Sequence, residues 1–194
     1  MANQIRKLKT GQLGKEWKTH DVAFATTVDN TGGTASMIPM TAIAQGDQSI
    51  DREGLDVRVQ SLKIDGYVTT SASTPTTILR MIIFSDTQQH GVKPTVTELL
   101  ETASVIGLKE HEAKGRFNIL LDKKMLYNHY VSGHTSVHKL SYYKKFKNGR
   151  KVSYLGTGTT SSNLGKGQLY ILMISDQATY TPTVTWNARL KFTD

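Results

Sequence analysis

The segment Thr77–Ala103, with the sequence TILRMIIFSDTQQHGVKPTVTELLETA, combines an apolar strand with the start of a helix. Residues 78–84 are apolar at nearly every position, which is typical of a strand covered on both faces. Thr95 and Glu98 have the Thr-x-x-Glu spacing of a capping box. Apolar residues at positions 96, 99, 100 and 103 then follow the spacing of one buried helix face. The segment predicts a buried strand followed by one short helix at about residues 95–103.

Strand signals dominate the rest of the chain. Apolar or alternating runs between turn residues predict strands at residues 21–28, 34–44, 55–70, 116–127, 137–146, 151–155, 168–175 and 183–192. The last run alternates strictly between apolar and polar residues, as expected for a strand with one buried face. Because no strand–helix–strand rhythm of a parallel sheet is present, we expect one all-β domain, an antiparallel sandwich or jelly roll.

Three local signals refine this expectation. Within residues 55–70 the apolar residues change from odd to even positions near Gln60-Ser61, which predicts a β-bulge or a passage between two sheets. Asn148-Gly149 is a strong two-residue turn signal, and it predicts a hairpin between residues 137–146 and 151–155. Pro39 within residues 34–44 indicates an edge strand.

The positive charge is concentrated in one part of the chain. The formal net charge is +8, and residues 123–175 contain nine Lys or Arg but no Asp or Glu. This segregation predicts contact with a polyanion, with a solvated lysine-rich loop as the alternative. Aromatic residues lie among these cations, and rings that stack on bases beside phosphate-binding lysines are typical of single-strand binding. In strands, however, alternate rings commonly face the core; the rings in question are Tyr142, Tyr143, Phe146 and Tyr154.

Residues 1–20 predict a short basic arm ahead of a single domain at residues 21–194. Neither part contains a catalytic motif such as Gly-x-Ser-x-Gly or His-Glu-x-x-His, so we expect no enzymatic activity. There is no cysteine, which excludes disulfides and cysteine-ligated zinc. No apolar run approaches the ~18 residues that a membrane helix needs, so we expect no membrane insertion.

Three histidines, His129, His134 and His138, are close enough in sequence to suggest a metal site. The segment has a strand-like pattern and no nearby carboxylate, which favours surface histidines instead. A jelly-roll binding module of the lectin or cupin kind, using these histidines, is one function that the residues leave open.

Five motifs that occur in order resemble those of a known family of viral coat proteins. The chain is similar to the single jelly-roll capsid proteins of the satellite tobacco necrosis virus type, a family that includes capsids of small Rep-encoding circular single-stranded DNA viruses. The motifs are Leu55–Gly66, Arg80–Asp86 with Pro94–Leu100, Arg116–Lys123, Gln168–Asp176 and Arg189–Asp194.

The resemblance implies an eight-stranded antiparallel jelly roll, with about sixty copies forming a closed T=1 icosahedral shell around a single-stranded genome. It implies that the protein is a virion component that assembles inside the host cell. The sequences Phe84–Asp86, Asp122–Lys124 and Ile174–Asp176 look closer to the circular-DNA group, which favours DNA over RNA as the cargo. The arm would contact the genome through Arg6, Lys7, Lys9, Lys15 and Lys18.

The predicted nucleic-acid site of the domain consists of Lys123, Lys144, Lys145, Lys147, Arg150 and Lys151. If residues 144–151 face the inside of the shell, they would bind the genome; if they face outward, they would suit a host cell-surface receptor with anionic sugars. The resemblance requires no cofactor, but it implies calcium at subunit contacts. The oxygen ligands would come from Glu53, Asp56, Asp21 and Asp194.

Overall fold

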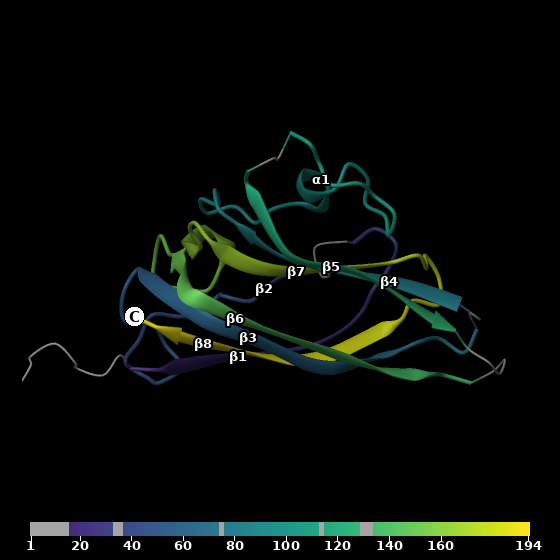
Figure 1. Ribbon diagram of the computed structural model, residues 1–194, viewed down its shortest axis with the longest axis horizontal. Helices are drawn as coiled ribbons and strands as arrows, with labels where there is room; N and C mark the ends of the chain where they lie inside the picture. The colour runs from purple at the N-terminus through teal and green to yellow at the C-terminus, as the bar shows by residue number, and fades with distance from the viewer. Residues whose placement is uncertain (1–15, 33–36, 74–75, 113–114, 129–133) are drawn as a thin grey trace, which may run out of the picture.

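The computed structural model describes residues 16–32, 37–73, 76–112, 115–128 and 134–194. These residues form eight strands: β1 (Lys18–Thr27), β2 (Met37–Pro39), β3 (Asp56–Thr69), β4 (Thr76–Asp86), β5 (Phe117–Asn128), β6 (Val137–Ser153), β7 (Gln168–Ser175) and β8 (Thr183–Thr193). All pairings are antiparallel, in two four-stranded sheets with the orders β1-β8-β3-β6 and β2-β7-β4-β5. The sheets lie one above the other as two layers (Figure 1). The predicted all-β, eight-stranded jelly roll is confirmed.

The main core lies between the two sheets. Alternate residues of β8, from Val184 to Phe192, point into it, as the strict alternation predicted. β4 and β7 are buried on both faces. Their inner faces contribute residues such as Met81 and Ile171 to the inter-sheet core. Their outer faces are apolar because a second cluster, including Leu99 and Leu100 of the region around α1, covers them.

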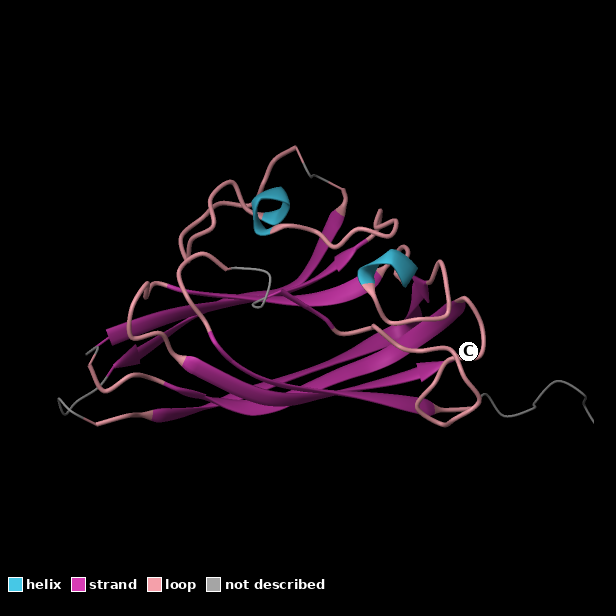
Figure 2. Ribbon diagram, turned by 180° about the vertical axis from the view of Figure 1, so that it is seen from behind, coloured by secondary structure: helices cyan, strands magenta, loops and turns pink. Residues whose placement is uncertain are grey.

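The predicted helix begins at the expected place but is shorter than expected. Helix α1 (Val96–Leu99) is capped by Thr95, and both capping-box hydrogen bonds with Glu98 are present. Leu100 is extended rather than helical, because the chain beyond it pairs with residues 108–110. Leu99 and Leu100 are both buried. Figure 2 shows α1 and the 3₁₀ helix η2 (Ser161–Asn163) outside the two sheets.

The bulge predicted in residues 55–70 is confirmed, because the register of β3 shifts between Val59 and Ser61. The predicted hairpin at Asn148-Gly149 is wrong. β6 is one strand that pairs with β3 on both sides of this point, with Ser61 opposite Lys145 and Val59 opposite Arg150. Residues 146–149 are therefore extra residues opposite Gln60 in the same antiparallel pair. β3 is long enough to pair with both halves of β6, which removes the need for a reversal.

Two boundaries also differ from the prediction. β1 begins at Lys18, so residues 18–20 belong to the sheet rather than to the arm. β2 contains only three residues, 37–39, although it is an edge strand and includes Pro39, as predicted. Within the described ranges, no helix is long and apolar enough to cross a membrane.

Candidate nucleic-acid interface

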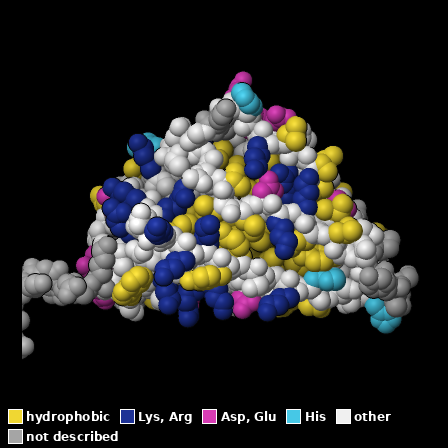
Figure 3. All heavy atoms as spheres, viewed as in Figure 1, with side chains coloured by type: hydrophobic (Ala, Val, Ile, Leu, Met, Phe, Trp, Pro, Cys, Tyr) yellow, Lys and Arg dark blue, Asp and Glu magenta, His cyan; other side chains and the backbone are white. Residues whose placement is uncertain are grey.

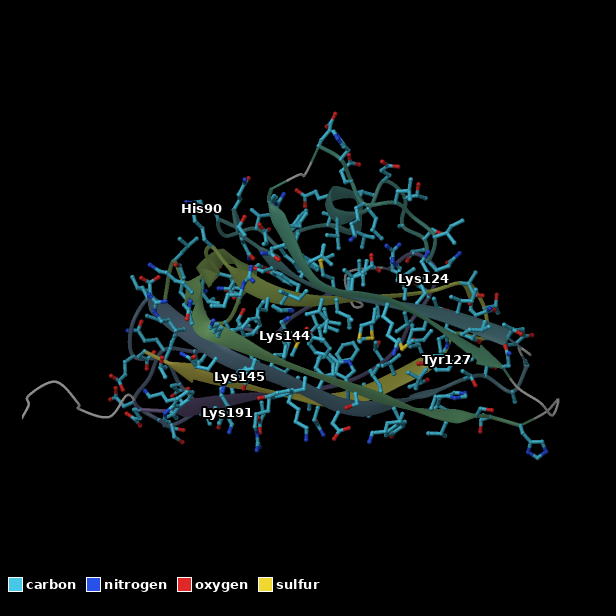
Figure 4. All side chains as sticks on the ribbon, in the orientation of Figure 1. His90, Lys124, Tyr127, Lys144, Lys145 and Lys191 are labelled. Carbon is cyan, nitrogen blue, oxygen red and sulfur yellow. The ribbon has the colours of Figure 1, made fainter. Side chains whose placement is uncertain are left out.

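The face of the β1-β8-β3-β6 sheet that points away from the core carries several cations, among them Lys145, Lys151, Arg189 and Lys191. In one row across the sheet, Ser61 of β3 has Lys191 of β8 on one side and Lys145 of β6 on the other. Residues directly opposite in an antiparallel pair project from the same face. Two strand spacings, about 10 Å, separate the two lysine backbones. Figure 4 shows both lysines at the same end of this sheet.

A surface hollow lies at this row, where the bulge of β3 at Gln60 faces the extra residues 146–149 of β6. The hollow has a volume of about 540 Å³ and lies where the extra residues of β6 leave the regular ladder. Its lining residues come from the start of β1, the β3 bulge, β6 and β8: Trp17, Lys18, Thr19, Gln60, Ser61, Tyr143, Lys145, Phe146, Lys147 and Lys191. Figure 3 shows Lys and Arg side chains gathered over the neighbouring surface.

Three of the four lysines that line the hollow differ from other cations of the sheet in their partners. Arg189 binds Asp21 with an N–O distance of 2.6 Å, and Lys151 binds Asp56 at 3.0 Å. In contrast, no acidic side chain of the described chain forms an ion pair with Lys145, Lys147 or Lys191. These three exposed ammonium groups are available to an external anion.

The predicted nucleic-acid residues are only partly brought together. Lys145 and Lys147 line the hollow, whereas Lys144 pairs with buried Leu62 and projects from the opposite side of β6. Arg150 is half-buried, and burial lowers the pKa of its guanidinium. Lys123 lies on β5 in the other sheet. The arm residues Arg6, Lys7, Lys9 and Lys15 lie outside the described residues.

Lys18 was predicted to contact nucleic acid, which requires an exposed ammonium group, but its side chain is buried. Its side chain is 2% exposed, and its Nζ lies 2.7 Å from Oε1 of Glu53 and 3.1 Å from Oδ2 of Asp194. Burial lowers the pKa of Lys18, but the hydrogen bonds and charges of the two carboxylates more than offset this and raise the pKa above its usual value. The ammonium is thus neutralised within the chain, which does not support a contact with nucleic acid.

Of the four aromatic residues predicted near the cations, one is fully available. Tyr143 is 63% exposed, whereas Tyr142 and Phe146 pack partly against the core. Tyr154 is buried and donates a hydrogen bond to the carbonyl of Thr41; burial raises the pKa of its phenol well above normal. The packing alternative therefore holds for three of the rings.

Trp17 and Lys191 belong to the hollow, but the sequence prediction did not include them. Trp17 is 63% exposed, and it lies immediately before β1. The strict alternation of residues 183–192 already places Lys191 on the outer face of the final strand. No local signal connects either residue to Tyr143, because three different strand pairings bring them together.

The four carboxylates predicted to bind calcium do not fit a metal site within one chain. Glu53 and Asp194 share the ammonium of Lys18, Asp21 is held by Arg189, and Asp56 accepts hydrogen bonds from Ser153 and Lys151. These contacts lower the pKa of Asp21 and of Asp56. Among the described residues, no group of three or more His, Cys, Asp or Glu is arranged to hold a metal ion.

The histidine cluster also has no metal-like arrangement in the part of the chain that is described. His138 stacks on Tyr127 with ring centroids 4.4 Å apart, and His134 is exposed. His129 lies outside the described residues. His134 therefore fits the surface interpretation, whereas His138 is half-buried and packs on Tyr127.

Comparison with solved structures adds little. A structure of infectious bursal disease virus, strain Gx, aligns with 90% of this chain at 8% identity and a TM-score of 0.36, and this chain spans about a third (32%) of that one. A 60-mer BFDV capsid protein aligns with 95% of this chain and 84% of its own length at 8% identity and a TM-score of 0.24. Structural similarity at this level supports no conclusion about this chain.

Comparison of sequences is decisive. The coat protein of Maize white line mosaic Satellite virus is 26% identical over 98% of this chain and 86% of its own length. The capsid protein of Satellite tobacco necrosis virus 1 is 30% identical over 76% of this chain and 73% of its own length. The coat protein of Satellite tobacco necrosis virus 2 is 27% identical over 95% and 89%, respectively. The profile of the satellite tobacco necrosis virus coat protein family matches residues 2–194, and the chain therefore belongs to this family of viral coat proteins.

Proposed function

We propose that this coat protein assembles into a small closed T=1 shell of about sixty copies that encloses a single-stranded nucleic acid. The role is structural and requires no reaction. The observation that carries the proposal is the row Lys191–Ser61–Lys145. Its two lysines have no ion-pair partner among the described residues, and both line one hollow of the jelly roll. Neutralisation of phosphates by such lysines is the main source of affinity for nucleic acid.

Exposed apolar side chains support assembly of many copies. The loop after α1 exposes 73% of Ile106 and 69% of Leu108, and Leu126 of β5 is 62% exposed. Contiguous patches of such side chains mark contacts between proteins, and in the proposed shell these three residues would be covered by neighbouring copies. They lie away from the basic hollow, which comes from the other sheet. In the proposed shell, the β1-β8-β3-β6 sheet faces the cargo, and the loop after α1 and the exposed side of β5 contact neighbouring subunits.

The kind of nucleic acid and the direction of the basic face need separate tests. The matching family and the three relatives are coat proteins of satellite viruses. They do not support the preference for DNA that was based on three short sequence motifs. If the basic face instead points outward, it would serve attachment to anionic sugars of a host cell-surface receptor. We propose that the basic face points inward, because a hollow with aromatic and cationic side chains can bind bases and phosphates together.

Electron microscopy of the purified protein, combined with the ratio of absorbance at 260 and 280 nm, tests the proposal. Uniform small spheres with a high ratio are expected, and digestion of the extracted cargo with DNase or RNase identifies it. Empty spheres would remove packaging from the proposal, and the absence of particles over a range of salt concentrations would remove the shell.

A triple substitution tests the direction of the basic face. Lys145, Lys147 and Lys191 are replaced with Gln, and the matched control replaces Lys109, Lys124 and Lys166, three exposed lysines outside the hollow and outside the predicted site, which removes the same charge elsewhere. The first variant is expected to package less nucleic acid than the control. Normal packaging together with lost cell attachment would show that the face points outward.

A further inference from the structure

We propose that the hollow at the β3 bulge is a base-stacking site, in which Trp17 and Tyr143 each stack on an unpaired base and Lys145, Lys147 and Lys191 hold the intervening phosphates. The inference rests on the proposed function, because it specifies how a packaged strand contacts the subunit. It goes further by assigning affinity to bases and by requiring unpaired nucleotides.

The exposure of the two rings is the first argument. Trp17 and Tyr143 both line the hollow, and each exposes 63% of its surface. Large rings are ordinarily buried, and an isolated exposed ring needs no explanation. Here, however, two such rings share one hollow with three lysines that lack an ion-pair partner among the described residues. Rings and cations in one groove are the features with which proteins bind single strands.

The geometry of the sheet sets the spacing. Trp17 precedes β1 and Tyr143 lies on β6, and these are the two edge strands of the β1-β8-β3-β6 sheet. Three strand spacings separate β1 from β6 by about 14 Å, and Tyr143 lies in the row of Asp21, four residues along the chain from Trp17, so the two ring-bearing backbones are farther apart than this. This is too far for both rings to enclose one base, so they stack on two different bases. Lys191 and Lys145 lie on the strands between and beside them, where the connecting phosphates would pass.

The irregularity in β6 supplies a wall for the hollow. The register opposite Gln60 moves from Lys145 to Arg150, so that Phe146 and Lys147 lie outside the regular ladder and line the hollow beside Ser61. A flat, regular sheet would present the same lysines without enclosing a ligand. The volume of about 540 Å³ lies within the usual range for sites of small organic ligands and accommodates bases rather than only an ion.

The positions of the two tryptophans provide a direct readout. Trp186 is 2% exposed, and its ring stacks on Phe24 in the core. Trp17 is therefore the tryptophan that a soluble ligand reaches. Stacking of a base on Trp17 is expected to quench its fluorescence, whereas binding of a chain without bases is not.

The test uses the full-length protein, freed of its cargo at high salt and returned to low salt, with labelled oligothymidylate and oligouridylate of about 15 nucleotides. The same sugar-phosphate chain without bases is the second probe. Affinity is measured by fluorescence anisotropy and quenching by tryptophan emission. The variants are Trp17→Leu and Tyr143→Leu. The matched control is Tyr67→Leu, which removes an exposed ring from the same strand that carries the bulge without altering the lining of the hollow.

Each ring substitution is expected to weaken binding of the oligonucleotides by roughly 5- to 100-fold, with the salt dependence unchanged, because stacking releases no counterions. The control is expected to bind as the wild type does, and the chain without bases is expected to bind the wild type and both ring variants equally weakly. Equal affinity for chains with and without bases, or absence of quenching, would overturn the stacking site while leaving packaging intact. A sulfated sugar that binds with an affinity dependent on Trp17 would also overturn it. If the wild-type protein bound none of the oligonucleotides and its shells were empty, the proposed function itself would be overturned.

Discussion

The ammonium of Lys18 lies 2.7 Å from Oε1 of Glu53 and 3.1 Å from Oδ2 of Asp194, and it joins the start of β1 to residues far away in the sequence. The lysine side chain is 2% exposed, whereas the side chain of Glu53 is 59% exposed. A buried cation thus closes the end of the sheet at which the described chain begins. Its two partners are carboxylates for which a metal ion was expected.

Replacement of Lys18 with Met is expected to lower the free energy of unfolding by about 1–3 kcal/mol, because Asp194 and Glu53 lose their hydrogen-bonded counter-charge. Chemical denaturation measures the change. The matched control is Lys63→Met, since the ion pair of Lys63 with Asp65 is exposed on both sides and should contribute less than about 1 kcal/mol. Equal effects of the two substitutions would contradict a special role for the Lys18 contacts.

Calcium removal is expected to have little effect on the isolated subunit, because each predicted carboxylate ligand already binds a cationic or hydroxyl side chain of its own chain. Thermal unfolding with EDTA and with added calcium measures this. A calcium ion between subunits stays a prediction, and a stabilisation by calcium that is seen only in assembled shells would support it. Stabilisation of the isolated subunit would show that the internal cations yield to the metal.

Acid is expected to destabilise the fold partly through Asp122. Hydrogen bonds from Arg80, at 2.8 and 2.9 Å, lower the pKa of this carboxyl. The pKa of Asp122 in the folded state thus lies below its unfolded value of about 4. Ionised Asp122 therefore stabilises the fold at a pH above about 4, and this contribution is lost as the pH falls through the folded pKa. Arg80 also donates to the carbonyl of Gly107, so the pair holds the loop after α1 in place.

The variant Asp122→Asn tests this contribution. It is expected to be less stable than the wild type at neutral pH by about 1–3 kcal/mol, and the difference should shrink as the pH falls below about 4. Urea denaturation at several pH values measures the free energy of unfolding. A difference that stays constant over this pH range would show that the charge of Asp122 is not the cause.

The conformation of the extra residues 146–149 of β6 depends on Gly149. Its φ is +68°, and a Cβ there would lie 2.8 Å from Nε2 of Gln60 and 3.2 Å from Cβ of Arg58. Gly149→Ala is therefore expected to cost about 1–3 kcal/mol of stability. Gly115→Ala is the matched control, because its φ is also positive at +92° but no atom lies within 4 Å of the added Cβ. A smaller loss for Gly149 than for Gly115, measured by thermal unfolding, would contradict the crowding at Gln60.

The lysines that have no ion-pair partner in the described part of the chain are expected to control the salt dependence of binding. Lys145→Gln and Lys191→Gln should each reduce the slope of log K against log salt by about 0.7, the value for one phosphate contact on a single strand. Lys151→Gln should change the slope less, because Asp56 already binds this lysine at 3.0 Å. Anisotropy titrations with a single-stranded oligonucleotide at several salt concentrations measure the slopes. An equal loss for all three variants would show that the internal ion pair is irrelevant to binding.

Local patterns in the sequence predicted much of the fold. The apolar run at 78–84, the strict alternation at 183–192 and the phase change at Gln60-Ser61 each depend on which side of a strand is buried, and that information repeats every two residues. The capping box of α1 was equally readable, because both partners lie within one turn. The cationic interval and five ordered motifs were enough to indicate a viral coat protein.

The sequence by itself thus determined most of the strands, their buried faces, the bulge in β3 and the family. Tertiary structure decided the partners. It made β6 a single strand despite Asn148-Gly149, since pairing with β3 on both sides outweighs a local turn preference. It also enclosed Lys18 between two carboxylates and brought Trp17 and Lys191 to the same hollow as Tyr143. These contacts depend on strand order, and strand order is set by burial of the whole core rather than by any neighbouring residues.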